Sequence, residues 1–296
     1  MIDKLLSLLL REVWALDATY VAAYQERVLK FIDGHTVDFS DLTHEQEIKL
    51  QVANAKGIFD VEDFDDEQAP EDSVAVINLR GVMLKYGGLC SYGTESIAEV
   101  MHGAMLKDNV KAIVLREHTP GGETSSVFPL KEIMANRTKP VITLVDNLSA
   151  SAGYYVGCMG DRVFAIDEMA EIGSIGAMAS LIKDVTKKED RKYEVIDLYP
   201  EESKHKHKVY RDALDGNTKG YIEEVLRPWA VNFQNHVKTM RGDKLNLKVE
   251  GLLEGKMFYA ADNNAHGLID GIKSFDNTIQ FALDMAESKS IINSIK

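Results

Sequence analysis

The chain has few of the features that mark secreted, membrane-spanning or nucleic-acid-binding proteins. Its 296 residues include only two cysteines, Cys90 and Cys158, too few for a disulfide framework, so we expect free, buried thiols. The apolar start, residues 1–11, is shorter than the roughly 20 residues that cross a bilayer. It has no cleavage site of small residues, so we expect an amphipathic helix and no stable membrane insertion. The net charge of −13 argues against binding to nucleic acid.

What the chain does have is enough apolar sequence for a full core, with 45% hydrophobic residues. Residues 1–56 are expected to be a helical N-terminal arm, and the acidic stretch 57–72 a linker. Beyond it, strand-like runs alternate with helix-like ones and lead into a long helix over 218–240. The alternation predicts βαβ units and a mostly parallel sheet in an α/β domain over 73–296. The expected strands lie near 74–79, 112–116, 140–145, 162–166 and 193–199, and the expected helices near 96–106, 125–135, 151–159 and 175–188.

The segment Ser149-Ala-Ser-Ala-Gly-Tyr-Tyr-Val-Gly-Cys158 directly follows the apolar run 141–145. A strand that turns into a helix here would place the hydroxyl of Ser151 at the helix N-terminus. Its neighbours Ala152 and Gly153 are too small to block a substrate backbone, and the free N–H groups of a helix start can stabilise an oxyanion. Serine is also a favoured helix cap, so this segment alone does not distinguish a nucleophile from a cap.

Two further glycine-rich segments follow strand-like runs of their own. Thr119-Pro-Gly-Gly122 comes after the run 112–115, and its glycines allow a backbone that exposes N–H groups to a ligand. Gly173-Ser-Ile-Gly176 precedes a helix-like stretch at 177–180. Each segment alone is compatible with a plain turn. Their order and spacing around Ser151 indicate a catalytic arrangement.

With these landmarks the chain resembles the signal peptide peptidase A (protease IV) family of serine proteases, and within it the capsid-maturation proteases of tailed phages. The resemblance runs from about residue 73 to about residue 275. It also includes the opening strand 74–81 and the closing element Ala261-Asp-Asn-Asn-Ala-His-Gly-Leu-Ile-Asp270. It implies a Clp protease–crotonase-like α/β fold and a homo-oligomer.

Enzymes of this family use a Ser-Lys dyad, in which a neutral lysine takes the proton of the serine. The resemblance implies Ser151 as the nucleophile, the N–H groups of Gly122 and Ala152 as the oxyanion hole, and Ser174 as a hydrogen-bonding partner of the lysine. Burial among apolar groups lowers the pKa of a lysine and so makes it a base. In the family this lysine lies some fifty residues beyond the serine, after a strand.

The lysine cannot be assigned uniquely, because Ser203-Lys-His-Lys-His-Lys208 offers three candidates. Counting forward from Gly176 favours Lys204, whereas the family's His-Lys context favours Lys206 or Lys208. We take Lys206 as the first candidate, with Lys204 and Lys208 as alternates. The paired histidines of this run do not make a closed metal site, so no metal and no cofactor are expected. Two other histidines, His118 and His266, have no spacing that favours a triad, and we expect surface or packing roles for both.

The sequence thus predicts a serine endopeptidase that processes capsid or scaffold proteins of a phage, in the host cytoplasm or the prohead. A soluble signal-peptide peptidase-like protease is the alternative within the same chemistry. A protease-like chain that serves only assembly is an alternative without chemistry, because one fold hosts many functions. A crotonase-type acyl-CoA enzyme is a further class, against which Ser151 and the tyrosines after it argue.

Overall fold

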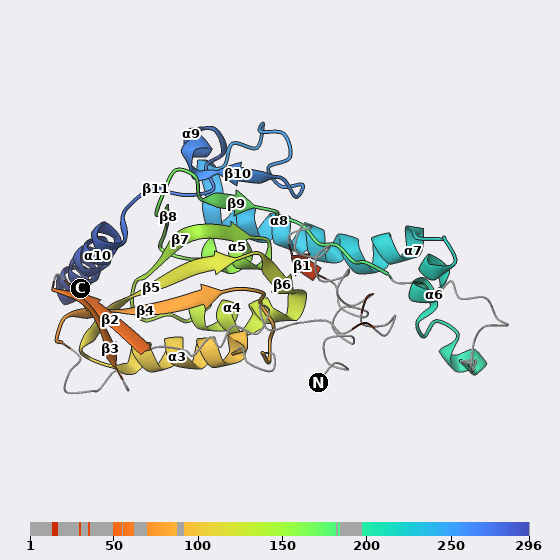
Figure 1. Cartoon of the computed structure of the whole chain (residues 1–296), viewed down its shortest axis with the longest axis horizontal. Helices are drawn as coiled ribbons and strands as arrows, with labels where there is room; N and C mark the ends of the chain where they lie inside the picture. Colours follow the sequence, from red (N-terminus) through yellow and green to blue (C-terminus); the bar gives the residue numbers. More distant parts are fainter. Residues whose placement is uncertain are drawn as a thin grey trace.

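The computed structural model describes residues 14–16, 30, 35, 50–54, 56–61, 70–87, 92–181, 183 and 197–295. Within these residues a sheet of nine strands runs through the molecule (Figure 1). Its strands pair in the order β10 (Met257–Tyr259), β9 (Glu171–Gly173), β7 (Val141–Ala150), β5 (Val110–Thr119), β4 (Ser73–Arg80), β2 (Leu50–Asn54) and β3 (Gly57–Val61). In addition, β8 (Arg162–Ala165) pairs with β7, and β11 (Gly271–Ile272) pairs with β8.

The centre of this sheet is parallel. Strands β4, β5 and β7 pair side by side in the same direction, and both β8 and β9 pair parallel to β7. Antiparallel strands are added only toward the edges, where β2 pairs with β4 and with β3, and β10 pairs with β9. The expected α/β class with a mostly parallel sheet is therefore confirmed. The strands expected near 74–79, 112–116, 140–145 and 162–166 are all present.

Helices bury both faces of the sheet, as a parallel sheet requires. On one face α3 (Thr94–Leu106), α4 (Val127–Ala135) and α5 (Ala152–Gly157) cover the larger core, to which α8 (Arg227–Arg241) contributes Phe233 and Val237. On the other face α10 (Phe275–Ile295) packs over β2, β4, β5 and β7 around a smaller core (Figure 1). The apolar strand runs of the sequence are thus buried from two sides.

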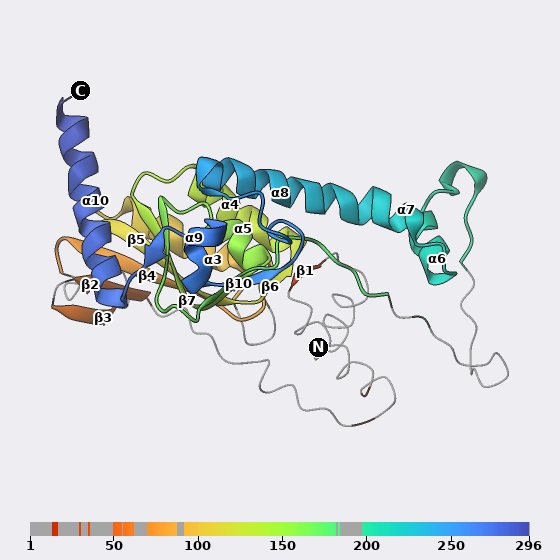
Figure 2. The same cartoon turned by 90° about the horizontal axis from the view of Figure 1, so that it is seen from above.

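Residues 201–241 extend from one end of this body as a helical projection, called the arm below. It is distinct from the N-terminal arm expected over residues 1–56. The long helix expected over 218–240 is observed as α7 (Lys219–Tyr221), a π-helical stretch (Ile222–Leu226) and α8 in succession. It carries α6 (Lys208–Leu214) at its outer end, far from the sheet in both views (Figures 1 and 2). Tyr210 of α6 packs against Tyr221 of α7, with ring centroids 6.5 Å apart. The segment with the candidate lysines therefore lies at the tip of the arm.

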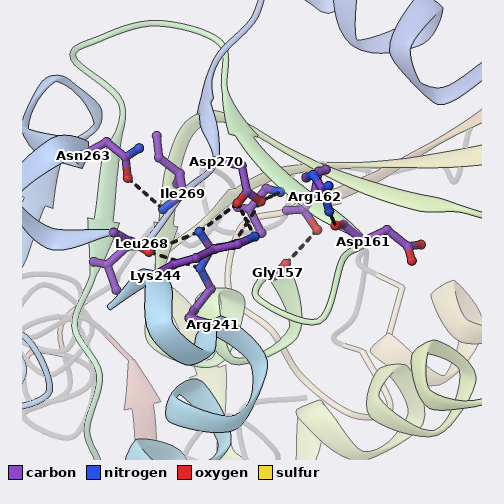
Figure 3. Close-up of polar contacts among 12 residues, drawn as sticks. Gly157, Asp161, Arg162, Arg241, Lys244, Asn263, Leu268, Ile269 and Asp270 are labelled. Atoms are coloured by element: carbon purple, nitrogen blue, oxygen red, sulfur yellow. Dashed lines mark hydrogen bonds and ion pairs between the residues drawn. The ribbon is translucent and has the colours of Figure 1, made fainter. Parts of the chain in front are cut away.

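A buried carboxylate fastens the inner end of α8 to the closing element that ends at Asp270 (Figure 3). Asp270 accepts hydrogen bonds from both terminal nitrogens of Arg241 at 3.1 and 3.2 Å and from Lys244 at 2.5 Å. Its second role is to accept the backbone N–H of Val163 in β8 at 2.8 Å. Burial alone would raise the pKa of Asp270, but the hydrogen bonds from Arg241 and Lys244 outweigh it and hold the pKa below its usual value.

The structure corrects three expectations about local structure. Residues 50–54 and 57–61 are strands of the main sheet, where a helical arm and an acidic linker were expected. The helix expected over 175–188 is absent from its described residues, 175–181 and 183, which run without helix after β9. The strand expected over 193–199 is also absent from its described residues, 197–199. For residues 50–54 and 57–61, pairing with each other and with β4 outweighed the local pattern.

Of the rest of the expected N-terminal arm and linker, the structure describes strand β1 (Trp14–Leu16) and residues 30, 35, 56 and 70–72; the remainder lies outside the described residues. None of the helices that the structure describes is both long enough and apolar enough to cross a membrane.

Candidate active site

Ser151 occupies the turn between β7 and α5, as the sequence predicts. Its backbone has φ 54° and ψ −120°, a conformation that residues other than glycine rarely adopt. The turn is held by the Ser151 N–H, which donates to the Gly173 carbonyl at 2.9 Å, and by the Ser151 carbonyl, which accepts from the Tyr155 N–H at 2.9 Å. Within the described part of the chain, the Ser151 hydroxyl makes no capping hydrogen bond to α5. The strained backbone and the missing cap bond both favour a nucleophile over a plain cap.

The loop Thr119-Pro-Gly-Gly122 lies beside this turn, because β5 and β7 are parallel neighbours and end together. The Thr119 hydroxyl donates to the Gly81 carbonyl at 2.6 Å and accepts from the Gly121 N–H at 3.1 Å. Gly121 has φ 93°, in the region that favours glycine. The chain then continues as a short strand, β6 (Gly121–Glu123), which packs against α5.

Gly122 is enclosed on one side by Met83. A Cβ built on Gly122 would lie 1.8 Å from the Met83 carbonyl oxygen, so only glycine fits. Met83 also pairs with β6: its N–H donates to the Gly121 carbonyl at 2.8 Å and its carbonyl accepts from the Glu123 N–H at 3.0 Å. Successive N–H groups of a strand point to opposite edges, so the N–H of Gly122 points to the other edge of β6.

That other edge of β6 is paired with β1. The two strands run antiparallel, with Leu16 opposite Gly121, Ala15 opposite Gly122 and Trp14 opposite Glu123. The backbone N–H expected to stabilise an oxyanion therefore faces residues from the beginning of the chain. No sequence pattern indicated this pairing, because residues 14–16 lie in the stretch expected to be helical.

A shallow apolar hollow that is open to solvent lies next to the nucleophile turn. Its walls come from the start of α5, from the segment after β6 and from α8, together with Gly176 and Ala177. The side chains that define it are Thr124, Val127, Ala152, Tyr155, Trp229 and Phe233. Tyr155 is held there by stacking on His236, with ring centroids 3.9 Å apart. Such a hollow suits an apolar side chain of a bound peptide.

The three candidate lysines do not meet Ser151 within one chain. All are exposed and lie in or before α6 at the tip of the arm (Figures 1 and 2). Lys204 pairs with Glu201 at 2.5 Å, Lys208 pairs with Asp212, and Lys206 lies in the turn between them. The lysine assignment stays a prediction.

The structure also places the other candidate residues of the site, Ser174, His266 and His118. Ser174 follows Gly173 with φ 52°, and its N–H donates to the Lys256 carbonyl at 3.1 Å. His266 is a packing histidine: it is buried, it contacts the Tyr259 carbonyl at 3.1 Å, and burial lowers its pKa. His118 is half-buried on β5. In the part of the chain that the structure describes, no three His, Cys, Asp or Glu side chains are grouped so that they could hold a metal ion.

Cys158 is buried and free, as expected, whereas Cys90 lies outside the described residues. Two features of the site escaped sequence reasoning. Trp229 lies in the helix expected over 218–240, but its place in the hollow depends on how α8 crosses α5. Glu117 looked like an ordinary strand residue, but it is completely buried two residues before Thr119.

Known proteins resemble this chain at low identity. Protease 4 of Haemophilus influenzae is 23% identical over 238 residues, which cover 74% of this chain and 35% of that protein. The chloroplastic serine protease SPPA of Arabidopsis thaliana is 24% identical over 233 residues, covering 73% of this chain and 32% of that protein. The chain thus spans about a third of the length of these curated relatives.

Solved structures resemble it only distantly. A variant of the 1510-N membrane-bound stomatin-specific protease has a TM-score of 0.44 and 14% identity, covering 71% of this chain and 82% of that one. An enoyl-CoA hydratase/isomerase structure from Acinetobacter baumannii has a TM-score of 0.42 and 18% identity, covering 76% and 85%. At these scores the observed sheet order, and not the likeness, carries the fold class.

The family model of Peptidase family S49 matches residues 134–289, more than half of the chain. The match includes the turn with Ser151, the exposed lysines of the arm and the closing element that ends at Asp270. The chain therefore belongs to Peptidase family S49.

Proposed function

We propose that the chain is a serine endopeptidase in which Ser151 is the nucleophile. The observation that carries this proposal is the strained Ser151 turn, whose hydroxyl is not used as a cap and which adjoins both the glycine loop and the apolar hollow. Family membership supports the same chemistry. The relatives' printed names describe proteases, and this chain covers only part of them.

The chemistry requires a base, an oxyanion site and a place for the substrate side chain. A neutral lysine amine takes the proton of the Ser151 hydroxyl while Oγ attacks the carbonyl carbon of the scissile bond. The N–H groups of Gly122 and Ala152 stabilise the oxyanion. When the tetrahedral intermediate collapses, the C–N bond breaks and the lysine ammonium protonates the leaving amine. Water then attacks the acyl-enzyme by the same route and regenerates the free serine.

The lysine comes, in this proposal, from the arm of a neighbouring subunit, with Lys206 as the first candidate. Two observations support a partner for the arm: it extends away from the body in both views, and it exposes apolar side chains such as Ile222 and Val231. An exposed lysine is charged in water, and docking onto another subunit would remove it from water and favour the neutral form. Ser174, beside the nucleophile turn, is the proposed hydrogen-bonding partner of that amine.

For the substrate we retain the proposal drawn from the sequence resemblance, capsid or scaffold proteins of a phage, with cleaved signal peptides as the alternative. The two substrate classes differ in form. Scaffold proteins are long chains cut at internal sites, whereas signal peptides are short and apolar throughout. Incubation with both substrate types, followed by mass spectrometry of the products, distinguishes them.

The decisive experiment compares the full chain with Ser151→Ala. The wild type is expected to react with a fluorophosphonate probe at Ser151 and to cleave a peptide library, and the variant should do neither. Within the described residues the Ser151 hydroxyl makes no capping hydrogen bond, so the variant should stay folded. A wild type that neither reacts nor cleaves at any protein concentration would instead support a role in assembly without catalysis.

A further inference from the structure

Glu117 is an acidic side chain placed where an apolar one is expected. It lies on β5 and has no solvent-exposed surface. Ile113 and Leu115, which share its face of the strand, belong to the larger core under α3, α4 and α5. An acid is rarely buried in such a place unless its carboxyl group has a specific partner.

The Glu117 carboxyl group contacts both elements that meet at Ser151. Ser149, two residues before the nucleophile on β7, donates its hydroxyl to Oε2 at 2.6 Å. On the other side lies Gly157 of α5, where an added Cβ would be 2.6 Å from the same oxygen. The carboxyl group therefore lies between the strand that leads into the nucleophile turn and the helix that leaves it.

Glu117 is also joined through its own strand to the glycine loop. The pairing of β5 with β7 shifts register between Glu117 and Thr119, so that Thr119 lies opposite Ser149. Thr119 then fixes Gly121 through its hydroxyl. The hydrogen bond between Glu117 and Ser149 spans this irregularity, at the point where the loop and the nucleophile turn diverge.

We propose that Glu117 is a positioning residue that holds the turn bearing Ser151 and the loop bearing Gly122 in a fixed relation. This inference rests on the proposed function of Ser151. Glu117 itself touches no reacting atom; it acts through Ser149 and α5.

The surroundings of Glu117 favour its neutral form. The groups that face it are the Ser149 hydroxyl from β7 and, more distantly, Tyr154 and Cys158 from α5. Within the described residues no cation pairs with it, and its Oε1 has no hydrogen-bond partner. Burial raises its pKa to about 8, although the hydrogen bond from Ser149 lowers it. A carboxylate here would add unpaired negative charge behind the N–H groups proposed to stabilise an oxyanion.

The test uses three variants of the full chain: Glu117→Gln, Glu117→Leu and Ser149→Ala. The Gln side chain keeps the acceptor without an ionisable proton, so its peptide cleavage near pH 7 should stay within about threefold of wild type. The Leu variant should lose on the order of 10-fold or more in kcat with KM little changed, since small misplacements of reacting groups lower rates steeply. Ser149→Ala should show a smaller loss of the same kind. Glu132→Gln, an exposed acid on α4, is the matched control.

The pH profile separates this role from general stability. Wild-type kcat should decline above about pH 8 as Glu117 ionises, and Glu117→Gln should remove that decline. An unchanged alkaline decline in the Gln variant, or wild-type kcat in a folded Leu variant, would overturn the proposal.

Amide hydrogen exchange gives a readout that does not depend on activity. The N–H groups of Ser151 and Tyr155 are hydrogen-bonded across the turn, so they should exchange faster in Glu117→Leu and as slowly as wild type in Glu117→Gln. If wild type lacks Ser151-dependent cleavage but these exchange rates change as stated, the proposed function is wrong, whereas the positioning role of Glu117 between the Ser151 turn and the Gly122 loop is supported. Unchanged exchange in the Leu variant would show that this positioning role is absent.

Discussion

Gly153 and Thr119 are in direct contact: a Cβ on Gly153 would lie 2.4 Å from the Thr119 methyl carbon. The helix that follows the nucleophile can therefore approach the loop after β5 only because residue 153 has no side chain. The same threonine holds Gly121 through its hydroxyl. Thr119 thus sets the distance between the nucleophile turn and the loop.

Gly153→Ala should consequently displace the nucleophile turn and reduce kcat/KM by on the order of 100-fold, the effect of misplacing a reacting group by about 1 Å. Steady-state kinetics and thermal unfolding measure the two effects separately. The matched control is Gly103→Ala, because a Cβ at Gly103 in α3 meets nothing within 4 Å. That change should raise stability by about 0.5–1 kcal/mol without altering the rate. Equal activity in the two variants would contradict the spacing argument.

Gly122→Val tests the oxyanion loop. Its Cβ would collide with the Met83 carbonyl, so β6 must shift and the Gly122 N–H must move with it. Loss of one oxyanion donor lowers the rate roughly 10²–10³-fold, and we expect a kcat loss of that size with Ser151 still present. Circular dichroism confirms the fold of the variant. A folded Gly122→Val protein with near-normal turnover would reduce the loop to a turn.

Complementation tests whether the lysine comes from a neighbouring subunit. Ser151→Ala and a Lys206→Ala variant should each be inactive alone. When the two variants are mixed and reassembled, activity should return at sites where Ser151 of one subunit meets the intact arm of the other. The same experiment with Lys204→Ala and Lys208→Ala identifies the base, since the two remaining lysines should be dispensable.

Dilution provides a second test of whether the site is shared between subunits. If the site is shared between subunits, specific activity should fall steeply as the protein is diluted to the point where light scattering reports monomers. Activity that is constant across that range, in a monomer, would place the base within one chain and reopen the search among other groups.

The ion pair at the inner end of α8 makes a prediction about stability. Arg241 is buried and bonded to Asp270, so Arg241→Ala removes the buried partner of that carboxylate and leaves it only the half-exposed Lys244 as a cation. The variant should lose unfolding free energy, up to the about 3–5 kcal/mol that a broken buried pair costs. Chemical denaturation measures this loss. The control is Arg227→Ala on the exposed part of the same helix, where a pair with Glu223 should contribute at most about 1 kcal/mol.

The same pair sets the sign of an acid effect. Because the pKa of Asp270 is held below its usual value in the folded protein, its contribution is present at neutral pH and is lost as pH falls through that lowered pKa. Wild type should therefore lose stability on acidification more steeply than Arg241→Ala. Parallel curves for the two proteins would contradict the assignment.

Local sequence signals were sufficient for the centre of the fold. The apolar runs that became β4, β5 and β7 are long enough to be recognised alone, and the turn at Ser151 follows from small residues directly after a strand. The order of the glycine segments placed the loop beside that turn, because parallel neighbours end at the same edge of a sheet.

Other features depend on partners far away in the chain. Residues 50–54 became a strand because β4 offered an edge, which outweighed their local pattern. The contact of Glu117 with Ser149 joins residues 32 positions apart, and no spacing rule marks an acid that will be buried. The run at 204–208 carries the right residue types, but only the path of α7 and α8 determines how far it lies from Ser151.

The pairing of β1 with β6 bears on how a peptide would enter the site. A strand edge can serve one partner at a time, and one edge of β6 is used by Met83 while the other is used by residues 14–16. An extended peptide that pairs with the second edge must exchange with the chain's own residues. Its apparent dissociation constant is then the intrinsic value divided by the fraction of molecules in which that edge is vacant.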